Sequence, residues 1–203
     1  NRMSLLELLF PGLSEIEGAE LPSWSDSDDP WSILSKSEGG LVWQIEDRFG
    51  KDGVFIHPSA IVGDFVEIEG ACYISENAVI RHGAFLRKGS WISEGALVGH
   101  PTEVKNSILL PGSKAPHFNY VGDSVVGFNS NLGAGVKLSN VRNDRREVVV
   151  TLKDGSRFCT RMNKISALIG DGSQLGCNVV TNPGAIIEVN SMVNPNETVT
   201  GWF

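Results

Sequence analysis

Cysteine is scarce in this sequence, and long apolar runs are missing altogether. Only three of the 203 residues are cysteines, Cys72, Cys159 and Cys177, and their scattered positions lack the spacing of a metal site. Such sparse use is typical of a reducing compartment, where cysteines serve as small apolar groups. No apolar run approaches the roughly 20 residues of a membrane span, and the Leu-rich start lacks the layout of a signal peptide. We therefore expect a cytoplasmic protein that does not bind membranes.

Acidic residues are scarce in the middle of the chain, although the whole chain carries a net charge of −7. Residues 81–164 hold 13 of the 17 basic residues and 6 of the 24 acidic ones, so this part carries +7 and the remainder −14. Segregation of this kind predicts an anionic ligand bound by the middle of the chain. The basic residues alternate with glycine, asparagine and short apolar residues, which favours a phosphorylated small molecule over nucleic acid.

Residues 1–53 show no repeating pattern, and we expect them to form an irregular, partly helical N-terminal extension. The stretch 3–10 is predicted to be a short helix that ends before Pro11. A polar, acidic linker follows around residues 23–31, then a helical turn or two, and then a strand or short helix over 41–49. We expect this extension to pack as a cap on one end of the main domain, residues 54–203.

From residue 56 onward, aliphatic residues recur at every sixth position. The spacing is neither that of a helix nor that of a half-buried strand. The positions are Ile56, Val62, Ile68, Ile74, Ile80, Leu86, Ile92, Val98 and Val104, then Val126, Leu132 and Leu138, then Ile169, Leu175, Thr181, Ile187, Val193 and Val199. Short strands with one large inward side chain each, separated by tight bends, satisfy such a period. Three of these strands complete a triangular coil, and the coils stack.

The predicted stack resembles the single-stranded left-handed parallel β-helix of the hexapeptide-repeat acyltransferases. The resemblance covers roughly residues 54–200 and implies an all-β fold. Two interruptions of the period, about 105–125 and 141–166, predict two loop insertions that project from the stack. Within the second, VVVTL, then Lys-Asp-Gly, then SRF predict a hairpin with a Gly-assisted turn. Insertions that leave a stacked core undisturbed are frequent carriers of function.

Histidine is also rare, with four in the chain: His57, His82, His100 and His117. His82 and His100 lie 18 residues apart, so we expect them to stack at one corner of successive coils. Three histidines bind zinc in β-helix enzymes of the carbonic anhydrase type. The usual pair a few residues apart is missing here, and we expect no metal site.

His117 differs from the other histidines because of the residues around it. A neutral imidazole can take a proton from an attacking amine or hydroxyl. The nearby cations able to hold a phosphate are Lys105, Lys114 and Arg146. The nearby amides able to bond sugar hydroxyls are those of Asn119, Asn131 and Asn140. The run NLGAG exposes backbone N–H groups that can stabilise the oxyanion of a tetrahedral intermediate.

Several runs around His117 resemble one enzyme family. EVKNS, GSKAPHFNYVGDS, NLGAG and SNVRND resemble the acetyltransferase domain of the bifunctional bacterial glucosamine-1-phosphate acetyltransferase/N-acetylglucosamine-1-phosphate uridyltransferase. The later run KISALIGDGSQLGCNVVTNPG resembles still more the archaeal sugar-1-phosphate enzymes that pair the same β-helix with a nucleotidyltransferase domain. The similarity spans about residues 84–187.

The resemblance implies an acetyl-CoA-dependent N-acetyltransferase that acts on an amino-sugar 1-phosphate, glucosamine 1-phosphate first, and needs no metal. In it His117 would be the general base that deprotonates the 2-amino group. The substrate-binding residues that it implies are Tyr120 and Asn131 for the sugar, Arg87 and Lys105 for its phosphate, Asn140 beside them, and Arg146 near the place of a usual lysine. The cofactor would contact the backbone around Ala134, and Cys177, where the bacterial family tends to have a serine.

The same resemblance implies a homotrimer with the cofactor between subunits. Nothing in residues 1–53 could replace the nucleotidyltransferase domain, so we expect no uridyltransferase activity and a separate enzyme that completes the nucleotide sugar. Pro116, Val141 and the second insertion depart from the bacterial pattern, which leaves the amino sugar open. Two alternatives remain. One is an acyltransferase for a longer acyl chain or a nucleotide-linked sugar, and the other is a non-catalytic β-helix that binds a sugar phosphate or scaffolds a nucleotidyltransferase.

Overall fold

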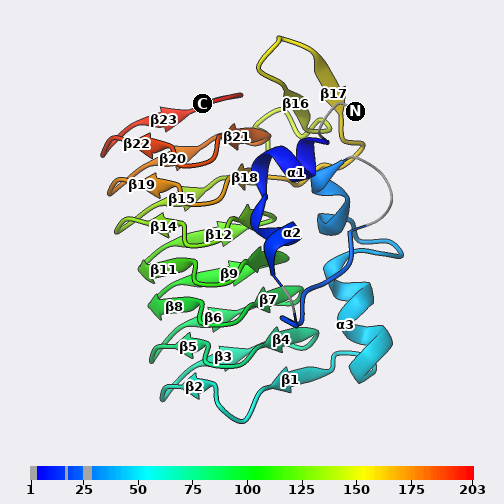
Figure 1. Ribbon diagram of the computed structural model, residues 1–203, viewed down its shortest axis with the longest axis vertical. Helices are drawn as coiled ribbons and strands as arrows, with labels where there is room; N and C mark the ends of the chain where they lie inside the picture. The colour runs from blue at the N-terminus through cyan, green and yellow to red at the C-terminus, as the bar shows by residue number, and fades with distance from the viewer. Residues whose placement is uncertain (1–3, 17, 25–28) are drawn as a thin grey trace.

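The computed structural model describes residues 4–16, 18–24 and 29–203, and from β1 onward the chain winds through three parallel sheets of short strands (Figure 1). Each sheet has seven strands and takes every third strand of the stack, apart from a separate two-stranded sheet that the chain forms between the fifth and sixth coils. The chain therefore passes from the first sheet to the second, then to the third, and back to the first in the next coil. These are the stacked coils that the period of six predicted, and the fold is the left-handed β-helix that the resemblance implied.

The first sheet contains β1 (Val54–Ile56), β4 (Cys72–Ile74), β7 (Ser90–Ile92), β10 (Ser107–Leu109), β13 (Val125–Val126), β18 (Ala167–Ile169) and β21 (Ala185–Ile187). The second contains β2 (Ile61–Val62), β5 (Val79–Ile80), β8 (Leu97–His100), β11 (Lys114–His117), β14 (Asn131–Leu132), β19 (Gln174–Leu175) and β22 (Met192–Val193). The third contains β3 (Glu67–Ile68), β6 (Phe85–Leu86), β9 (Glu103–Lys105), β12 (Tyr120–Gly122), β15 (Lys137–Leu138), β20 (Val180–Thr181) and β23 (Thr198–Val199).

The aliphatic residues of the six-residue period point into the stack and form its core, as predicted. Ile74, Ile92 and Leu109 pair in register along the first sheet and are fully buried. Each such side chain removes apolar surface from water by packing against the coils above and below. Ile56 and Val62 remain exposed because they belong to the first coil of the stack, which has a neighbouring coil on one side only.

The expected insertion at about 105–125 is wrong. These residues form a complete coil of β10, β11 and β12, and Leu109, Ala115 and Val121 lie fully buried in the core. The inward positions here are Val104, Leu109, Ala115, Val121 and Val126, so the step shrinks from six to five at two corners between the third and first sheets.

Two polar residues account for the short corners. Asn106 and Asp123 adopt left-handed backbone conformations, with φ of +43° and +45°. Asparagine and aspartate enter this region more readily than most residues, and the sharp turn lets the chain reach the first sheet one residue early. The Asn106 amide also donates a hydrogen bond to the Asp123 carboxylate over 2.9 Å, which ties the two corners together.

The second expected insertion is confirmed. Between β15 and β18 the chain leaves the stack and forms an antiparallel hairpin of β16 (Val149–Thr151) and β17 (Arg157–Cys159). The hairpin rises beside the C-terminal coils (Figure 1). Val148 and Val150 are buried against the outer face of the first sheet, so the insertion is packed rather than loose.

The N-terminal extension contains helices α1 (Leu5–Leu9), α2 (Gly12–Glu15) and α3 (Leu41–Phe49) and a 3₁₀ helix (Pro30–Leu34). Ser4 begins α1 with a capping box, because its hydroxyl accepts from the Glu7 amide while the Glu7 carboxylate accepts from the Ser4 amide. Residues 25–28 of the expected linker lie outside the described residues. None of the helices in the described part of the chain is both long and apolar enough to cross a bilayer.

The expected position of the extension at one end of the stack is wrong. Figure 1 shows α1, α2 and α3 along one side of the coils. The outward side chains of the first sheet are apolar, and the extension and hairpin bury them. They are Tyr73, Trp91, Ile108, Val125, Leu168 and Ile186. Leaving this row exposed would cost the free energy of hydrating it, which is why the extension covers a face rather than an end.

Candidate functional site

Each coil places one residue at the same point of the corner between the second and third sheets. Backbone hydrogen bonds fix this column: the His100 carbonyl accepts from Phe118 N at 3.0 Å, and the His117 carbonyl accepts from Gly135 N at 3.0 Å. In the following coil the Ala134 carbonyl accepts from Asn178 N at 2.9 Å. The column therefore runs through His82, His100, His117, Ala134 and Cys177. His117, Ala134 and Cys177, which lie 60 residues apart in sequence from first to last, occupy three successive coils.

His117 ends β11 with its side chain exposed. Its backbone amide donates to Asn119 Oδ1 at 3.0 Å, and Asn119 Nδ2 donates to the Gly133 carbonyl at 2.8 Å. Asn119 is only 3% exposed, so its amide holds the corner and does not reach a ligand. The expectation that Asn119 bonds a sugar hydroxyl is therefore wrong.

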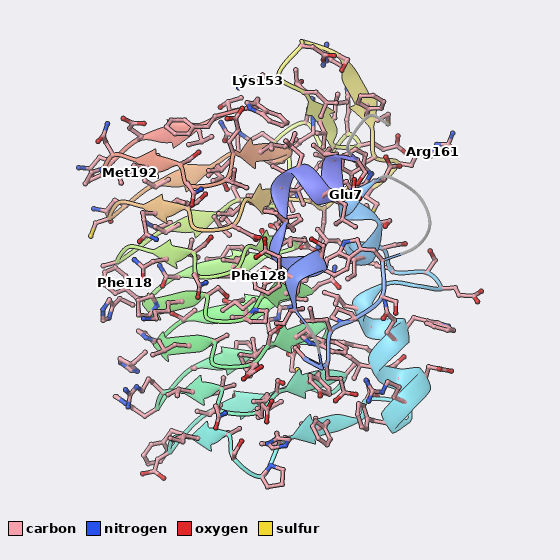
Figure 2. All side chains as sticks on the ribbon, in the orientation of Figure 1. Glu7, Phe118, Phe128, Lys153, Arg161 and Met192 are labelled. Carbon is pink, nitrogen blue, oxygen red and sulfur yellow. The ribbon has the colours of Figure 1, made fainter. Side chains whose placement is uncertain are left out.

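The aromatic ring of Phe118 lies beside this corner. Phe118 is 55% exposed and projects from the edge of the stack on the side away from the N-terminal helices (Figure 2). An added Cβ on Gly135 would lie 2.9 Å from the Phe118 ring, so glycine leaves room for the ring in this position. The corner thus presents His117 and an apolar ring side by side.

His82 and His100 stack as predicted. Their ring centroids lie 4.3 Å apart with 15° between the planes, and His100 Nδ1 lies 2.8 Å from the His82 carbonyl. These contacts explain both residues as a corner stack. Among the described residues, no group of three metal-ligating side chains is close enough to hold an ion.

The outer face of the third sheet begins next to this column. Phe85, Glu103, Tyr120 and Lys137 pair in register along it. The Tyr120 hydroxyl lies over Gly122, where an added Cβ would stand 2.7 Å from it. Burial, together with the carboxylates of Asp123 and Glu103, raises the pKa of Tyr120, which keeps its hydroxyl neutral and able to donate.

Arg87 and Lys105 follow in adjacent coils of the same sheet, and each is paired with a carboxylate. Arg87 Nη1 donates to Glu103 Oε1 at 2.9 Å, and its Nε lies 3.6 Å from Glu69 Oε2. Lys105 Nζ donates to Asp123 Oδ2 at 2.9 Å. The two cations expected to bind phosphate are thus on one face, but carboxylates offset much of their charge.

Asp123 is a central residue that the sequence reading missed. It is 1% exposed, and its carboxylate accepts from Lys105, Asn106 and Asn140. The Asn106 amide also donates to the Leu34 carbonyl of the N-terminal extension at 2.9 Å. The available signal was that Asp123 is the one acidic residue between Glu103 and Asp144 in the basic part of the chain. The role of Asp123 depends on which cation it pairs with in the neighbouring coil, and the shortened corners decide that pairing.

Two expected site residues lie elsewhere. Asn131 is on the outer face of the second sheet, in register between Lys114 and Gln174, whereas Tyr120 and Lys105 are on the third. Arg146 is largely exposed in the insertion, and its Nε lies 3.9 Å from Asp144 in the same loop. One copy of the chain therefore gathers His117, Tyr120, Arg87, Lys105 and Asn140 around one face and its border, without Asn131 or Arg146.

Several known proteins are similar to this chain in sequence. The bifunctional sugar-1-phosphate nucleotidylyltransferase/acetyltransferase of Sulfurisphaera tokodaii is 34% identical over 194 residues, which cover 87% of this chain and 46% of that protein. The bifunctional protein GlmU of Methanococcus maripaludis is 31% identical over 203 residues, 91% of this chain and 46% of the relative. GlmU of Clostridioides difficile is 32% identical over 162 residues, 76% of this chain and 33% of the relative. The chain thus spans about half the length of the curated relatives it matches first.

The model of one protein family covers most of the β-helix. It is described as the GMPPB C-terminal domain and matches residues 68–200, from β3 to the end of β23. This range includes every coil that contributes to the corner column and to the cationic face. With a match over more than half of its length and with hexapeptide coils throughout, the chain belongs to the GMPPB C-terminal domain family.

Proposed function

We propose that this chain is an acetyl-CoA-dependent N-acetyltransferase acting on an amino-sugar 1-phosphate, with glucosamine 1-phosphate as the first candidate. The observation that carries the proposal is the corner column, in which an exposed His117 is followed by Ala134 and Cys177 in the next two coils and borders a face that holds Tyr120. The names of the relatives, which include sugar-1-phosphate and acetyltransferase, agree with it.

In the proposed reaction the 2-amino group attacks the carbonyl carbon of the acetyl thioester. A neutral ring nitrogen of His117 takes the proton from the attacking amine, the C–S bond breaks, and the proton returns to the leaving sulfur. The products are the N-acetylated sugar phosphate and free CoA. Within the run 133–135 the backbone N–H of Ala134 stabilises the oxyanion, because those of Gly133 and Gly135 already donate to the Leu175 and His117 carbonyls.

The two substrates meet at His117 from opposite directions along the stack. Tyr120 lies in the coil of His117, and Arg87 and Lys105 lie in the two coils before it, so these residues suit the sugar phosphate. Ala134 and Cys177 lie in the two coils after it and suit the thioester. Holding both substrates side by side supplies much of the rate, since effective molarities of oriented groups reach about 10⁵ M or more. No metal takes part in this scheme.

We propose a homotrimer as the working state. Phe65, 93% exposed, and Phe118 stand at equivalent points of the same corner, and Met192 is exposed on the adjoining second sheet. Exposed apolar side chains at one edge favour burial against another copy. Contact at this edge would also bring Asn131 of one copy toward the third sheet of another. Light scattering should give three chains per particle, and Phe118→Ser should shift the mass toward the monomer.

The first experiment measures thiol release from acetyl-CoA with glucosamine 1-phosphate. His117→Ala should lower turnover by about 10²-fold or more, the scale of general-base loss. His57→Ala is the control, because it removes a half-buried histidine in the first coil, at the far end of the stack. Unchanged turnover in His117→Ala would remove this residue from the proposed role.

The same assay with other acceptors and other acyl donors distinguishes the alternative functions. Turnover with galactosamine 1-phosphate, a nucleotide-linked amino sugar or a longer acyl-CoA, but not with glucosamine 1-phosphate and acetyl-CoA, would change the substrate and keep the reaction. Binding of a sugar phosphate without turnover on any of these pairs would favour the non-catalytic β-helix.

A further inference from the structure

The cations on the outer face of the third sheet differ in whether a carboxylate already opposes them. Arg87 is paired with Glu103 and Glu69, and Lys105 is paired with Asp123. Lys137, in the next coil after Tyr120, is exposed, and among the described residues no carboxylate forms an ion pair with it. An anion approaching this face therefore meets the strongest uncompensated positive charge at Lys137.

We propose that Lys137 is a phosphate-binding residue of the candidate site, an inference that rests on the proposed function. Lys137 pairs in register with Tyr120 on one side and with Val180 on the other. Its side chain therefore points outward from the same face as the tyrosine expected to contact the sugar.

The position of the Lys137 ammonium ties it to the corner column. Nζ donates to the Gly135 carbonyl at 2.7 Å, and the amide of the same glycine donates to the His117 carbonyl at 3.0 Å. The ammonium is thus held beside the corner that carries His117 and Phe118. Because this hydrogen bond restricts the long side chain, Lys137 loses less conformational entropy when it binds an anion.

The donors of Lys137 suit a phosphate. An ammonium has three N–H donors, and the Gly135 carbonyl uses one, so two remain for phosphate oxygens. Lys105 is only 17% exposed and has one donor on a buried carboxylate, so a phosphate would have to compete with Asp123 for it. Lys137 offers its charge without such competition.

The phosphate can come from either substrate. The acceptor carries a 1-phosphate, and acetyl-CoA carries phosphates on its nucleotide end. Lys137 lies in the coil of Ala134, which is assigned to the thioester, and pairs with Tyr120 of the preceding coil, which is assigned to the sugar. The shared chemistry is a phosphate oxyanion, and the experiment separates the sources.

Binding is measured first, because it does not depend on turnover. Glucosamine 1-phosphate and CoA are titrated separately by calorimetry into wild type, Lys137→Gln and Lys51→Gln. The last variant removes another exposed lysine in a turn at the edge of the stack. A charged hydrogen bond lost from a phosphate should weaken one of the two ligands by about tenfold or more in Lys137→Gln, with wild-type affinity in Lys51→Gln.

The ligand that weakens identifies the source. Equal affinity of both ligands for wild type and Lys137→Gln would overturn the inference, and so would a wild type that binds neither. Steady-state kinetics then distinguish this inference from the proposed function. A KM raised for one substrate with kcat retained supports phosphate binding by Lys137, whereas binding that needs Lys137 in a protein without turnover would keep the inference and refute the acetyltransferase.

Discussion

Replacing Asp123 by alanine should destabilise the fold by about 3–5 kcal/mol, the range for removing one partner of a buried ion pair. The carboxylate is 1% exposed and accepts from Lys105 and Asn106, each at 2.9 Å, and from Asn140. Without it the Lys105 ammonium, 17% exposed, loses its counterion, and two buried amides lose their acceptor. Each charge-assisted hydrogen bond contributes about 1.5–3 kcal/mol. If Lys105 turns toward solvent in the variant, the loss of stability should lie near the lower end of the range of about 3–5 kcal/mol.

The assay is urea unfolding followed by circular dichroism, with a check that the transition has no populated intermediate. A thermal scan should show a midpoint lower by about 2–4 °C for each kcal/mol in a chain of this size. Asp144→Ala is the control, because it removes an exposed carboxylate that pairs with Arg142 within one loop. Such exposed pairs contribute little.

The cost should depend on Lys105. In a double-mutant cycle with Lys105→Met, the double mutant should lose less stability than the two single mutants lose together. The reason is that the second substitution removes the cation that the first leaves unpaired. Fully additive losses, or an Asp123→Ala variant as stable as Asp144→Ala, would refute the reasoning that this carboxylate holds the shortened corners together.

Two further predictions concern titratable groups. Burial raises the pKa of the Cys72 thiol to about 12, so a thiol reagent at neutral pH should modify Cys159 and Cys177 in the native protein and Cys72 only after unfolding. Three equivalents of reagent consumed at the same rate would contradict this burial. Burial also raises the pKa of Asp171, against the lowering effect of bonds from the Gly12 and Phe128 amides. Asp171 should therefore contribute its full stabilisation below about pH 4, the ordinary pKa of an aspartate in the unfolded chain. This stabilisation should be lost as the pH rises through the pKa of Asp171 in the folded protein. Asp171→Asn should flatten that part of the pH profile, and an identical profile would show that another group titrates.

The six-residue period predicted the β-helix because the pattern is local and repeated. Each inward aliphatic residue needs only its own strand and one coil on either side, and Ile74, Ile92 and Val98 are fully buried as expected. The hairpin of 149–159 could also be predicted, because a Gly-assisted turn between two β-prone runs is a local signal. The capped helix α1 follows from the same kind of local rule.

The shortened corners could not be separated from an insertion by counting alone. A step of 22 residues between Val104 and Val126 fits a loop as well as it fits two corners that are one residue short. The left-handed conformations of Asn106 and Asp123 decide between them, and those are stabilised by contacts across coils.

By itself, the sequence determined the stack of coils, the core, the second insertion and the recurrence of residues such as His82 and His100 at one corner. The tertiary structure decided which charges are free to act. Arg87 and Lys105 meet carboxylates that lie 16 to 18 residues away in sequence, whereas Lys137 meets none among the described residues. It also decided that the N-terminal extension covers the apolar outer face of the first sheet. A periodic pattern specifies which side chains point inward, but pairing between outward side chains depends on the register of neighbouring coils.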